Sequence, residues 1–525
     1  MFRFRVRTNK RILAICLIVL VVGVFFAGYQ LGVMQTQNSA IIIEPRSFTE
    51  TASYIIFGED TNNDGIMDII YAKNGKTGEI DFHGTDAATV IQNAIDALKV
   101  SYGARYKLTG KIFLKAGSYE LKKPLNLTNV YNIQFEGEGG INEEGQTQLL
   151  IATNNIGFDL TGARFCTFRN LVFKTQTGYT PKAHILLARD SSGESAGDHV
   201  FDRCTFYGDA EYGLIYNYGS EFNEFRECVF FSKRRALILT ESNILGITSP
   251  YVTIATGDQS MLQNFFDDCI FDRPSGLSPT GETILMNGGG SHVFTKCFVG
   301  GGTLYFIKID FSNNDNVNGV VIRETNFESM LLTVDAQTAS KYIFGWRIEN
   351  VYFGYSEGGV YIDCNKENVL FSNGIIRGVR ALWGKTCEFR FWRVYRSIID
   401  VRGSVTPITL TINVIDASKI IGYKDYTSIS SYVGNLNIVE YIDALTKNSG
   451  IATGLSNGAY IAHGLVDVPS VVVLTCLNAT YDGVPVIVSW NQALTNSTHI
   501  AVNIYWANGT AIADPVIAVS WYAEV

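Results

Sequence analysis

Several acidic residues stand in arrangements that could do chemistry. Asp267 and Asp268 are adjacent, and a pair of carboxylates is what a glycoside hydrolase uses as its acid and its base or nucleophile. Five more acids lie in the middle of the chain and could line a cleft: Asp198, Asp209, Glu211, Asp272 and Glu282. No spacing rule selects among these five, so the residues leave the catalytic set unknown.

A second candidate for chemistry is the segment 60–68. Four oxygen-bearing side chains occupy positions one, three, five and nine of a loop with Gly at position six: Asp60, Asn62, Asp64 and Asp68. This spacing matches the first part of an EF-hand-type Ca²⁺ loop, so Ca²⁺ is the cofactor we predict. Tyr71 takes position twelve, where a carboxylate is expected. An acidic hairpin turn between two strands is the alternative, because Asn-Asp-Gly favours tight turns.

The N-terminus has the pattern of a membrane anchor. Residues 1–11 form a basic tail with five Arg or Lys, and residues 12–34 carry no charge. Twenty-three residues in a helix span about 34 Å, enough to cross a bilayer core. The basic tail predicts a cytoplasmic N-terminus and an extracellular body, at the cell membrane. A cleaved signal peptide is the alternative, and it exports the body as well.

Composition narrows the class of protein. Charged residues make up only 18% of the 525 residues, aromatics reach 12%, and the net charge is −8. Abundant Phe, Tyr, Ile and Val with 50 Gly favour an all-β protein, and the acidic balance argues against a nucleic-acid partner. Four Asn-x-Ser/Thr sequences are candidate glycosylation sites, although chance matches are common in such a chain: Asn126, Asn478, Asn496 and Asn508.

A six-residue pattern recurs through the centre of the chain. It consists of an apolar residue, two polar residues, a small or apolar residue, any residue, and an apolar residue, as in Phe201–Phe206 and Phe225–Phe230. The pattern starts at 130, 168, 201, 225, 266, 294, 322, 348, 371 and 389, so its spacing varies. A fixed strand–bend–strand element joined by loops of unequal length is typical of a solenoid.

Stacking of these units predicts ladders of equivalent residues. Cys204, Cys228, Cys269 and Cys297 share the inward fourth position, so we expect packed, reduced thiols there. The second bend residue should form another ladder: Asn132, Asn170, Arg203, Glu227, Asp268, Lys296, Glu324, Asn350 and Asn373. Asp267-Asp268 falls in this bend, which favours a structural role for the pair over catalysis.

The N-terminal opening of the solenoid resembles that of known proteins. Residues 85–100 predict a helix capped by Asp86, with an apolar stripe that covers the first coil. Thr85–Ile95, Gly110–Tyr119 and Phe135–Gly139 together are similar to the opening of pectate-lyase-superfamily proteins, which include tailspike-like surface proteins. The resemblance covers about residues 83–420 and implies a right-handed parallel β-helix.

The activity of that superfamily does not carry over. Arg377–Arg380 and Arg393–Arg396 lack the Pro of the lyase motif Arg-x-Pro-x-x-Arg. Of the polygalacturonase motifs only Asp267-Asp268 is present. If the protein is an enzyme, we expect a polysaccharide lyase or a glycoside hydrolase outside these two standard types.

The sequence therefore predicts six parts. They are the tail 1–11, the transmembrane helix 12–34, a β-hairpin stalk 45–82, the β-helix 83–420, a connector 421–449 and an antiparallel β-sandwich 450–525 that resembles phage tail-fibre modules. We expect loops at 174–199, 232–264 and 272–292 to wall a groove, with tyrosines that stack on sugars: Tyr207, Tyr212, Tyr216 and Tyr218.

Two functions follow from this organisation. The first is binding or processing of a surface polysaccharide, for which the tailspike resemblance suggests a homotrimer. The alternative is a structural or adhesive cell-surface protein without catalysis.

Overall fold

The computed structural model describes residues 52–525 except for short gaps. The gaps are 103–104, 140–144, 258, 260, 262, 274–280, 301–304, 313–315, 336–340, 355–358, 382–386, 403–407, 424–426, 434–436, 443–446, 463–467, 478–479, 482–483, 497–498, 507, 509, 512–516 and 525. The predicted tail and transmembrane segment therefore lie outside the described residues. Within them, no helix is long and apolar enough to cross a membrane.

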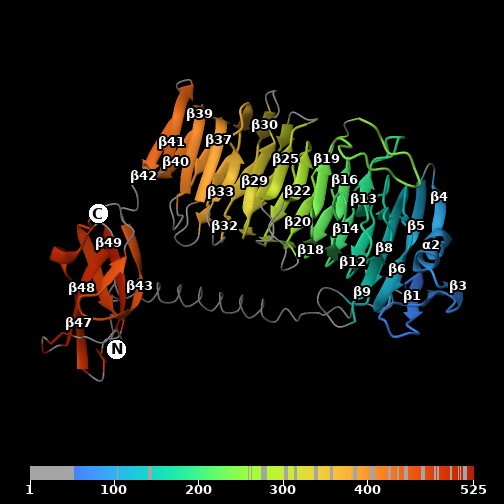
Figure 1. Cartoon of the computed structure of the whole chain (residues 1–525), viewed down its shortest axis with the longest axis horizontal. Coiled ribbons are helices and arrows are strands. Elements are labelled where there is room, and N and C mark those ends of the chain that lie inside the picture. The colour runs from blue at the N-terminus through green and yellow to red at the C-terminus, as the bar shows by residue number, and fades with distance from the viewer. Residues whose placement is uncertain are drawn as a thin grey trace, which may run out of the picture. The chain divides into compact units, whose positions relative to one another are not determined.

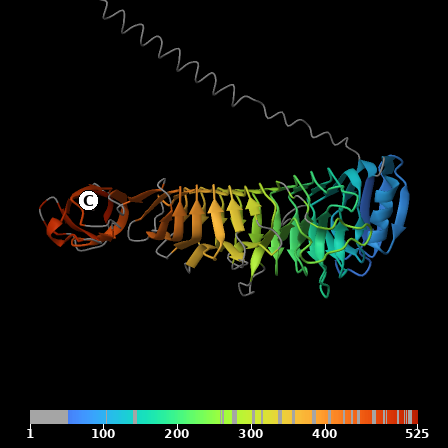
Figure 2. The same ribbon diagram turned by 90° about the horizontal axis from the view of Figure 1, so that it is seen from above.

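Three parallel sheets, here called A, B and C, form a parallel β-helix (Figures 1 and 2). Each coil contributes a strand to A, then B, then C, and each strand pairs with its equivalent in the next coil. This confirms the predicted fold, and the long parallel sheets are consistent with right-handed winding.

Sheet A consists of β5 (Arg105–Leu114), β8 (Val130–Gly137), β11 (Thr167–Arg169), β14 (Val200–Asp202), β17 (Glu224–Arg226), β20 (Phe265–Asp267), β23 (Val293–Thr295), β27 (Val321–Arg323), β31 (Arg347–Glu349), β35 (Ile375–Arg377), β38 (Ile398–Asp400), β40 (Lys419–Tyr423) and β42 (Ile438–Ile442). Sheet B consists of β6 (Gly117–Leu121), β9 (Thr147–Ile151), β12 (Val172–Thr175), β15 (Thr205–Gly208), β18 (Val229–Ser232), β21 (Ile270–Asp272), β24 (Phe298–Val299), β28 (Asn326–Phe327), β32 (Tyr352–Phe353) and β36 (Arg380–Ala381).

Sheet C consists of β7 (Leu125–Asn126), β10 (Ile156–Asp159), β13 (Ala183–Ala188), β16 (Ile215–Tyr218), β19 (Leu237–Thr240), β22 (Glu282–Asn287), β25 (Tyr305–Asp310), β29 (Met330–Asp335), β33 (Gly359–Cys364), β37 (Cys387–Tyr395), β39 (Ile408–Asp416) and β41 (Thr427–Val433). A short ladder of β26 (Asn316–Asn318), β30 (Lys341–Phe344) and β34 (Val369–Ser372) joins it at β37. The second half of β37 pairs with β34 and its first half with β33, so one long strand continues two short ones.

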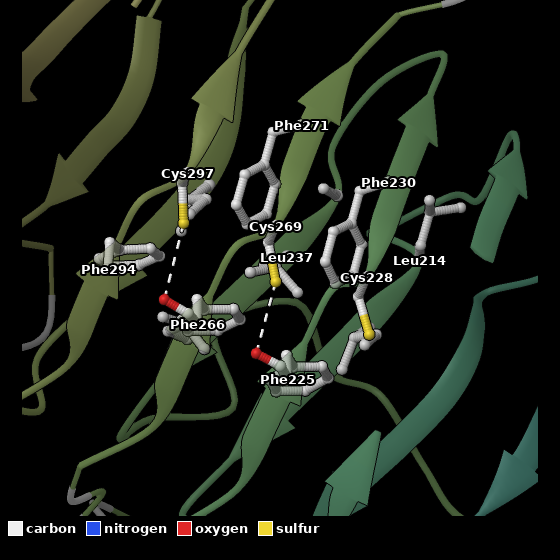
Figure 3. Close-up of a cluster of buried hydrophobic side chains, with 14 of the residues drawn as sticks. Leu214, Phe225, Cys228, Phe230, Leu237, Phe266, Cys269, Phe271, Phe294 and Cys297 are labelled. Carbon is white, nitrogen blue, oxygen red and sulfur yellow. Dashed lines mark hydrogen bonds between the residues drawn. The ribbon is translucent and has the colours of Figure 1, made fainter. Parts of the chain in front are cut away.

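Stacked aromatic and thiol ladders fill the interior (Figure 3). Phe201, Phe225 and Phe266 stack with ring centroids 4.8 Å apart, which is the spacing of neighbouring strands. Cys269 and Cys297 place their thiols 3.4 Å and 3.6 Å from the carbonyl oxygens of Phe225 and Phe266. The predicted thiols are buried and free, and burial raises the pKa of Cys204, Cys228 and Cys269 well above the ordinary value. The ladder is therefore a packing device of unreactive thiols.

The corner between sheets A and B is the predicted bend. Seven residues there adopt left-handed backbone conformations, with φ between 50° and 55°: Asn170, Arg203, Glu227, Asp268, Lys296, Glu324 and Asn350. Asn132 and Asn373 lie elsewhere, each three residues before an inward residue: Asn132 stands inside β8, and Asn373 stands between β34 and β35. The start at 389 is wrong, because residues 389–394 lie inside the continuous strand β37. The same polar-polar signature at two different corners explains these errors.

A polar ladder lies buried at the corner between sheets C and A. His199 Nδ1 accepts the N–H of Cys166 at 3.2 Å, and His199 donates its own N–H to Asn223 Oδ1 at 3.3 Å. Asn264 Oδ1 then accepts from Asn223 N, and His292 Nδ1 from Asn264 N, each at 3.2 Å. Each side chain thus satisfies a backbone donor of the preceding coil, which would otherwise be buried without a partner.

The N-terminal end is closed by a helix. α2 (Ala87–Ala97) begins at Asp86, whose side chain accepts the N–H of Ala88, as predicted. It ends before residue 100 because β4 (Lys99–Tyr102) starts there and pairs with β5. Its apolar face belongs to the solenoid core.

The predicted hairpin stalk is part of the first layer. β1 (Tyr54–Glu59) and β2 (Ile69–Asn74) form the expected antiparallel hairpin, and β3 (Ile80–Gly84) extends it. β1 also pairs in parallel with β5, so this region continues sheet A.

Residues 241–257, here called the strap, cover the outer face of sheet C (green, beside β13 and β16 in Figure 1). An apolar cluster outside the main core joins Leu186, Tyr216 and Ile238 of the sheet to Ile247 and Ile254 of the strap. The three segments expected to be loops therefore contain strands β13, β19 and β22, whose two faces are both buried.

The parallel ladder continues into the predicted connector. β41 pairs with β39, and β42 pairs with β40, so the solenoid extends to Ile442. Residues 447–524 form two antiparallel sheets around one small core, as expected of a β-sandwich. Their elements are β43 (Lys447–Leu455), β44 (Tyr460–Ala462), β45 (Val471–Cys476), β46 (Thr480–Tyr481), β47 (Val484–Trp490), η2 (Gln492–Leu494), β48 (His499–Trp506) and β49 (Ile517–Glu524).

Candidate functional site

A charged pocket opens where three successive connections from sheet B to sheet C stack. Its volume is about 290 Å³. We call it the corner pocket and define it by its lining residues: Glu211, Arg234, Arg235, Gly281 and Glu282. Glu211 follows β15, the two arginines follow β18, and Gly281 and Glu282 lead into β22. The parallel stacking of three coils thus brings together residues up to seventy-one positions apart, from 211 to 282.

Glu282 is the most enclosed acid of the pocket. Only 7% of its side chain is exposed, and Oε1 accepts a hydrogen bond from Arg235 Nε at 2.5 Å. Arg273 lies behind it, almost fully buried, and donates from Nη2 to the carbonyl oxygen of Arg234 at 2.9 Å. Burial lowers the pKa of Arg273, while the negative charge of Glu282 raises it. Glu282 is therefore a carboxylate paired with the guanidinium group of Arg235 and influenced by the charge of Arg273.

Glu211 differs from Glu282 in its surroundings. Its side chain is exposed, and it makes no ion pair with any residue whose position is described. Its neighbour Asp209 approaches Arg234 Nε at 3.2 Å, but that Asp209 oxygen makes no hydrogen bond of proper angle. The pocket thus combines one unpaired carboxylate with one buried and paired carboxylate.

A buried histidine supports the wall that carries Glu211. Thr175 Oγ1 donates to the carbonyl oxygen of Asp209 at 2.6 Å and lies 2.7 Å from His184 Nε2. Because the hydroxyl has one proton, His184 Nε2 must be the donor to Thr175. Burial lowers the pKa of His184 to about 3, so the ring is neutral and acts as a fixed support.

The structure selects among the acids that the sequence left open. Glu211 and Glu282 line the pocket, and Asp209 and Asp272 stand where the same connections begin. Asp272 Oδ1 accepts the N–H of Arg273 at 2.7 Å and so helps to position that arginine. Asp198 lies at another corner, where it pairs with Arg164.

Asp267 and Asp268 do not form a site. Asp267 stands on the outer face of sheet A between Arg226 and Thr295 of the neighbouring coils. Asp268 occupies the left-handed bend with φ of 53°. The structural role predicted for the pair agrees with these positions.

The four tyrosines expected to stack on sugars divide into two groups. Tyr207 is 36% exposed, and Tyr212, next to Glu211, is partly exposed. Tyr216 and Tyr218 are buried beneath the strap, where Tyr216 donates to Asn243 Oδ1 at 3.1 Å and Tyr218 to the carbonyl oxygen of Gly257. The expectation was therefore wrong for Tyr216 and Tyr218, because the strap covers that face.

The arginines of the pocket were not predicted from the sequence. A signal exists, since Lys233-Arg234-Arg235 is a basic run in a chain with only 18% charged residues. Arg273 carries no such signal, because its role depends on packing against residues of another coil.

The predicted Ca²⁺ loop is closed by its own backbone. Asp60 accepts the N–H groups of Asp64 and Gly65 at 3.2 Å and 2.8 Å, and Asp68 accepts the N–H of Thr61 at 2.8 Å. Across the described part of the chain, no three His, Cys, Asp or Glu side chains gather to hold a metal. Ca²⁺ at this loop stays a prediction, which also involves Asn62.

The glycosylation sites stay predictions as well. Asn126 is half-buried and its Oδ1 accepts from Thr128, while Asn496 and Asn508 are exposed. Asn478 lies outside the described residues.

Comparison with known proteins shows only distant structural similarity. No family model matches the chain, and no curated protein matches it. A tailspike protein of the E. coli bacteriophage HK620 is similar with a TM-score of 0.41 and 11% identity, over 84% of this chain and 90% of that one. PfbA, a surface adhesin of Streptococcus pneumoniae, has a TM-score of 0.38 and 13% identity over 68% and 88% of the two chains.

The Agl-KA catalytic domain is similar at a TM-score of 0.36 and 12% identity, over 68% and 66% of the two chains. Values this low carry no argument about function. The fold of this chain is established by its own strand pairing.

Proposed function

We propose that this protein binds a polysaccharide at the corner pocket and acts on it as a glycoside hydrolase. One observation carries the proposal: two carboxylates of different character line the same pocket. Glu211 is exposed and makes no ion pair with a described residue, whereas Glu282 is buried and bonded to Arg235. Two carboxyl groups in different surroundings are the requirement for glycoside hydrolysis, because one must donate a proton while the other stays ionised.

The size of the pocket fits this chemistry. A sphere of the pocket's volume is about 8 Å across, and carboxyl pairs in glycosidases stand about 5 to 10 Å apart. Arg235 donates to Glu282 Oε1 and places a positive charge beside it, so we assign Glu282 as the base or nucleophile. Glu211 is then assigned as the acid that protonates the leaving oxygen, a role that requires the bound glycan to exclude water from its exposed side chain.

Exposed aromatics and arginines would hold the polymer beside the carboxylates. Tyr212 follows Glu211 in the chain, and Tyr207 lies on the outer face of sheet B in the same coil. An aromatic face stacks on the apolar face of a sugar ring, and Arg234 supplies hydrogen-bond donors to hydroxyl or carboxylate oxygens.

The experiment is a glycan screen with the intact chain, followed by product analysis of every polysaccharide that binds. We expect the protein to bind at least one polysaccharide and to shorten it. Glu282→Gln should weaken the binding, and Glu211→Gln should abolish the shortened products. Glu227→Gln, an exposed carboxylate of the A–B bend, is the matched control and should leave both unchanged. Binding and cleavage that survive both pocket substitutions would refute the assignment.

A structural or adhesive role is the second candidate. The unbroken ladders of sheet A make a stiff spacer, and this observation favours a body that displays its C-terminal sandwich. Binding of a surface glycan without any shortened product would favour this role over catalysis.

Export and Ca²⁺ binding complete the proposal. The uncharged segment 12–34 would anchor the body outside the cell, and protease added to intact cells should then degrade the body. Ca²⁺ at Asp60, Asp64 and Asp68 would raise the melting temperature of the intact chain, and Asp60→Asn should remove that effect. A homotrimer, tested by mass in solution, stays a prediction.

A further inference from the structure

The strap lines an open pocket of its own. Its volume is about 800 Å³, which lies within the usual range for small-molecule sites. Among the residues that the structure describes, its lining lies within the strap, between Ser242 and Gly257, and carries no charged side chain. This strap pocket is thus chemically unlike the corner pocket, where charged side chains make up most of the lining.

The strap pocket is held in shape by bonds to distant coils. Ser249 Oγ donates to the buried carboxyl of Asp159, and Tyr251 donates to the carbonyl oxygen of Pro124 at 2.5 Å. The strap backbone also bonds to Arg189 and Ser191, at 2.9 Å and 2.8 Å. A site fixed before binding loses little conformational freedom when a ligand enters.

The lining offers neutral hydrogen-bonding groups beside apolar ones. Thr248, Thr253 and Thr256 are exposed, and their hydroxyls make no side-chain hydrogen bond within the part of the chain described. Ile247 and Ile254 form the buried apolar part of the wall. A hydroxyl both donates and accepts, so these groups match the hydroxyls of a sugar, while the isoleucines match its C–H faces.

Charged ligands fit this pocket poorly. A carboxylate or sulfate group would lose part of its hydration without meeting an oppositely charged side chain. A neutral sugar has no such penalty, because each of its hydroxyls can exchange a water for a threonine.

We propose that the strap pocket binds a neutral monosaccharide unit of a glycan, as a site separate from the corner pocket. Arg235 and Ser242 flank strand β19 at its two ends, so about 23 Å of extended chain separates the pockets. Binding at the strap pocket does not require the corner pocket to be catalytic, so the two proposals fail separately.

The test is titration calorimetry of the intact chain with maltohexaose, cellohexaose and chitohexaose, and with hexagalacturonate as the charged probe. Thr253→Trp and Thr256→Trp place a large side chain into the pocket from exposed positions, so folding should be preserved. We expect each to weaken binding of a neutral hexamer at least tenfold. Thr475→Trp, at an exposed strand position of β45, is the matched control and should change affinity less than twofold.

The corner variant Glu282→Gln separates the two sites. Neutral-hexamer binding that survives Glu282→Gln but fails in both tryptophan variants supports the strap pocket. Binding that fails only in Glu282→Gln overturns the strap proposal and leaves the proposed function standing. The strap proposal is also overturned if none of the three neutral hexamers binds, or if hexagalacturonate alone does.

Discussion

Two corners of the same coil have opposite characters. Between sheets A and B, each of four consecutive turns contains two residues: 170–171, 203–204, 227–228 and 268–269. Between sheets B and C, the turns after β15, β18 and β21 span six, four and nine residues: 209–214, 233–236 and 273–281. The constant corner carries charges of both signs in successive coils, while the variable corner gathers acids and arginines into a pocket.

The difference teaches where a solenoid can place chemistry. At a constant corner every residue faces its equivalent one strand spacing away, so Asp267 lies beside Arg226 of the preceding coil. The charge of Asp267 thus acts on the guanidinium group of Arg226, which bonds Glu224 of its own coil. At the variable corner the connections differ in length, so arginines and acids of different coils meet there, as Arg235 and Glu282 do.

Removing a ring of the phenylalanine ladder in sheet A, beside the constant corner, should have the largest effect. Phe225→Ala opens a cavity between Phe201 and Phe266 and should lower the free energy of unfolding by about 3–5 kcal/mol. Phe222→Ala, three residues away and 38% exposed, should change it by less than about 0.5 kcal/mol. Urea unfolding of both variants measures the contrast, and equal losses would contradict the ladder as the source of stability.

The second largest effect should be a loss of folding stability in acid, caused by the buried histidines. Burial lowers the pKa of His199 to about 3 and of His292 to about 4, both below the unfolded value of about 6.5. The unfolded chain therefore binds more protons below that value, and stability present above about pH 6.5 is lost as pH falls toward the folded pKa values. Each histidine should lower the free energy of unfolding by about 2 kcal/mol between pH 7 and pH 5.

His199→Asn separates this effect from general acid sensitivity. Asn occupies the equivalent position in the next two coils and keeps an acceptor for Cys166 N. Between pH 7 and pH 5 the free energy of unfolding of the variant should fall by less than that of the parent chain, the difference being the contribution of one histidine. An unchanged pH profile would show that His199 is not buried as a neutral ring.

The backbone of the constant corner gives the smallest effect. Lys296 adopts φ of 54°, which costs a lysine more than an asparagine. Lys296→Asn should raise the free energy of unfolding by about 0.5–1 kcal/mol, and Asn170→Lys should lower it by a similar amount. Thermal melting checks this: the melting temperature should rise for Lys296→Asn and fall for Asn170→Lys. A shift of both variants in the same direction would contradict the left-handed bend.

The constant corner was largely predictable from sequence because its pattern repeats. Phe201, Cys204 and Phe206 recur with the same internal spacing in the following coils, which identified the ladders. Sheet C was hidden, because Ala183–Ala188 is buried on both faces and shows no alternation. The strap was also hidden, since its bond from Tyr251 to Pro124 joins residues 127 positions apart.

The corner pocket was only half predictable. The sequence identified its acids as candidates without ranking them. Their partners come from other coils, as Arg235 does for Glu282. Nothing in the local sequence fixes how connections of different length stack, so no spacing rule could select Glu211 and Glu282.

The most direct measurement compares two triple variants that each remove three carboxylates. One is Asp209→Asn, Glu211→Gln and Glu282→Gln at the variable corner. The other is Glu227→Gln, Asp268→Asn and Glu324→Gln at the constant corner. Affinity for the tightest glycan of the screen should fall at least about tenfold in the first and change less than about twofold in the second. Equal affinities in the two variants, or a loss confined to the second, would contradict the assignment of function to the corner pocket.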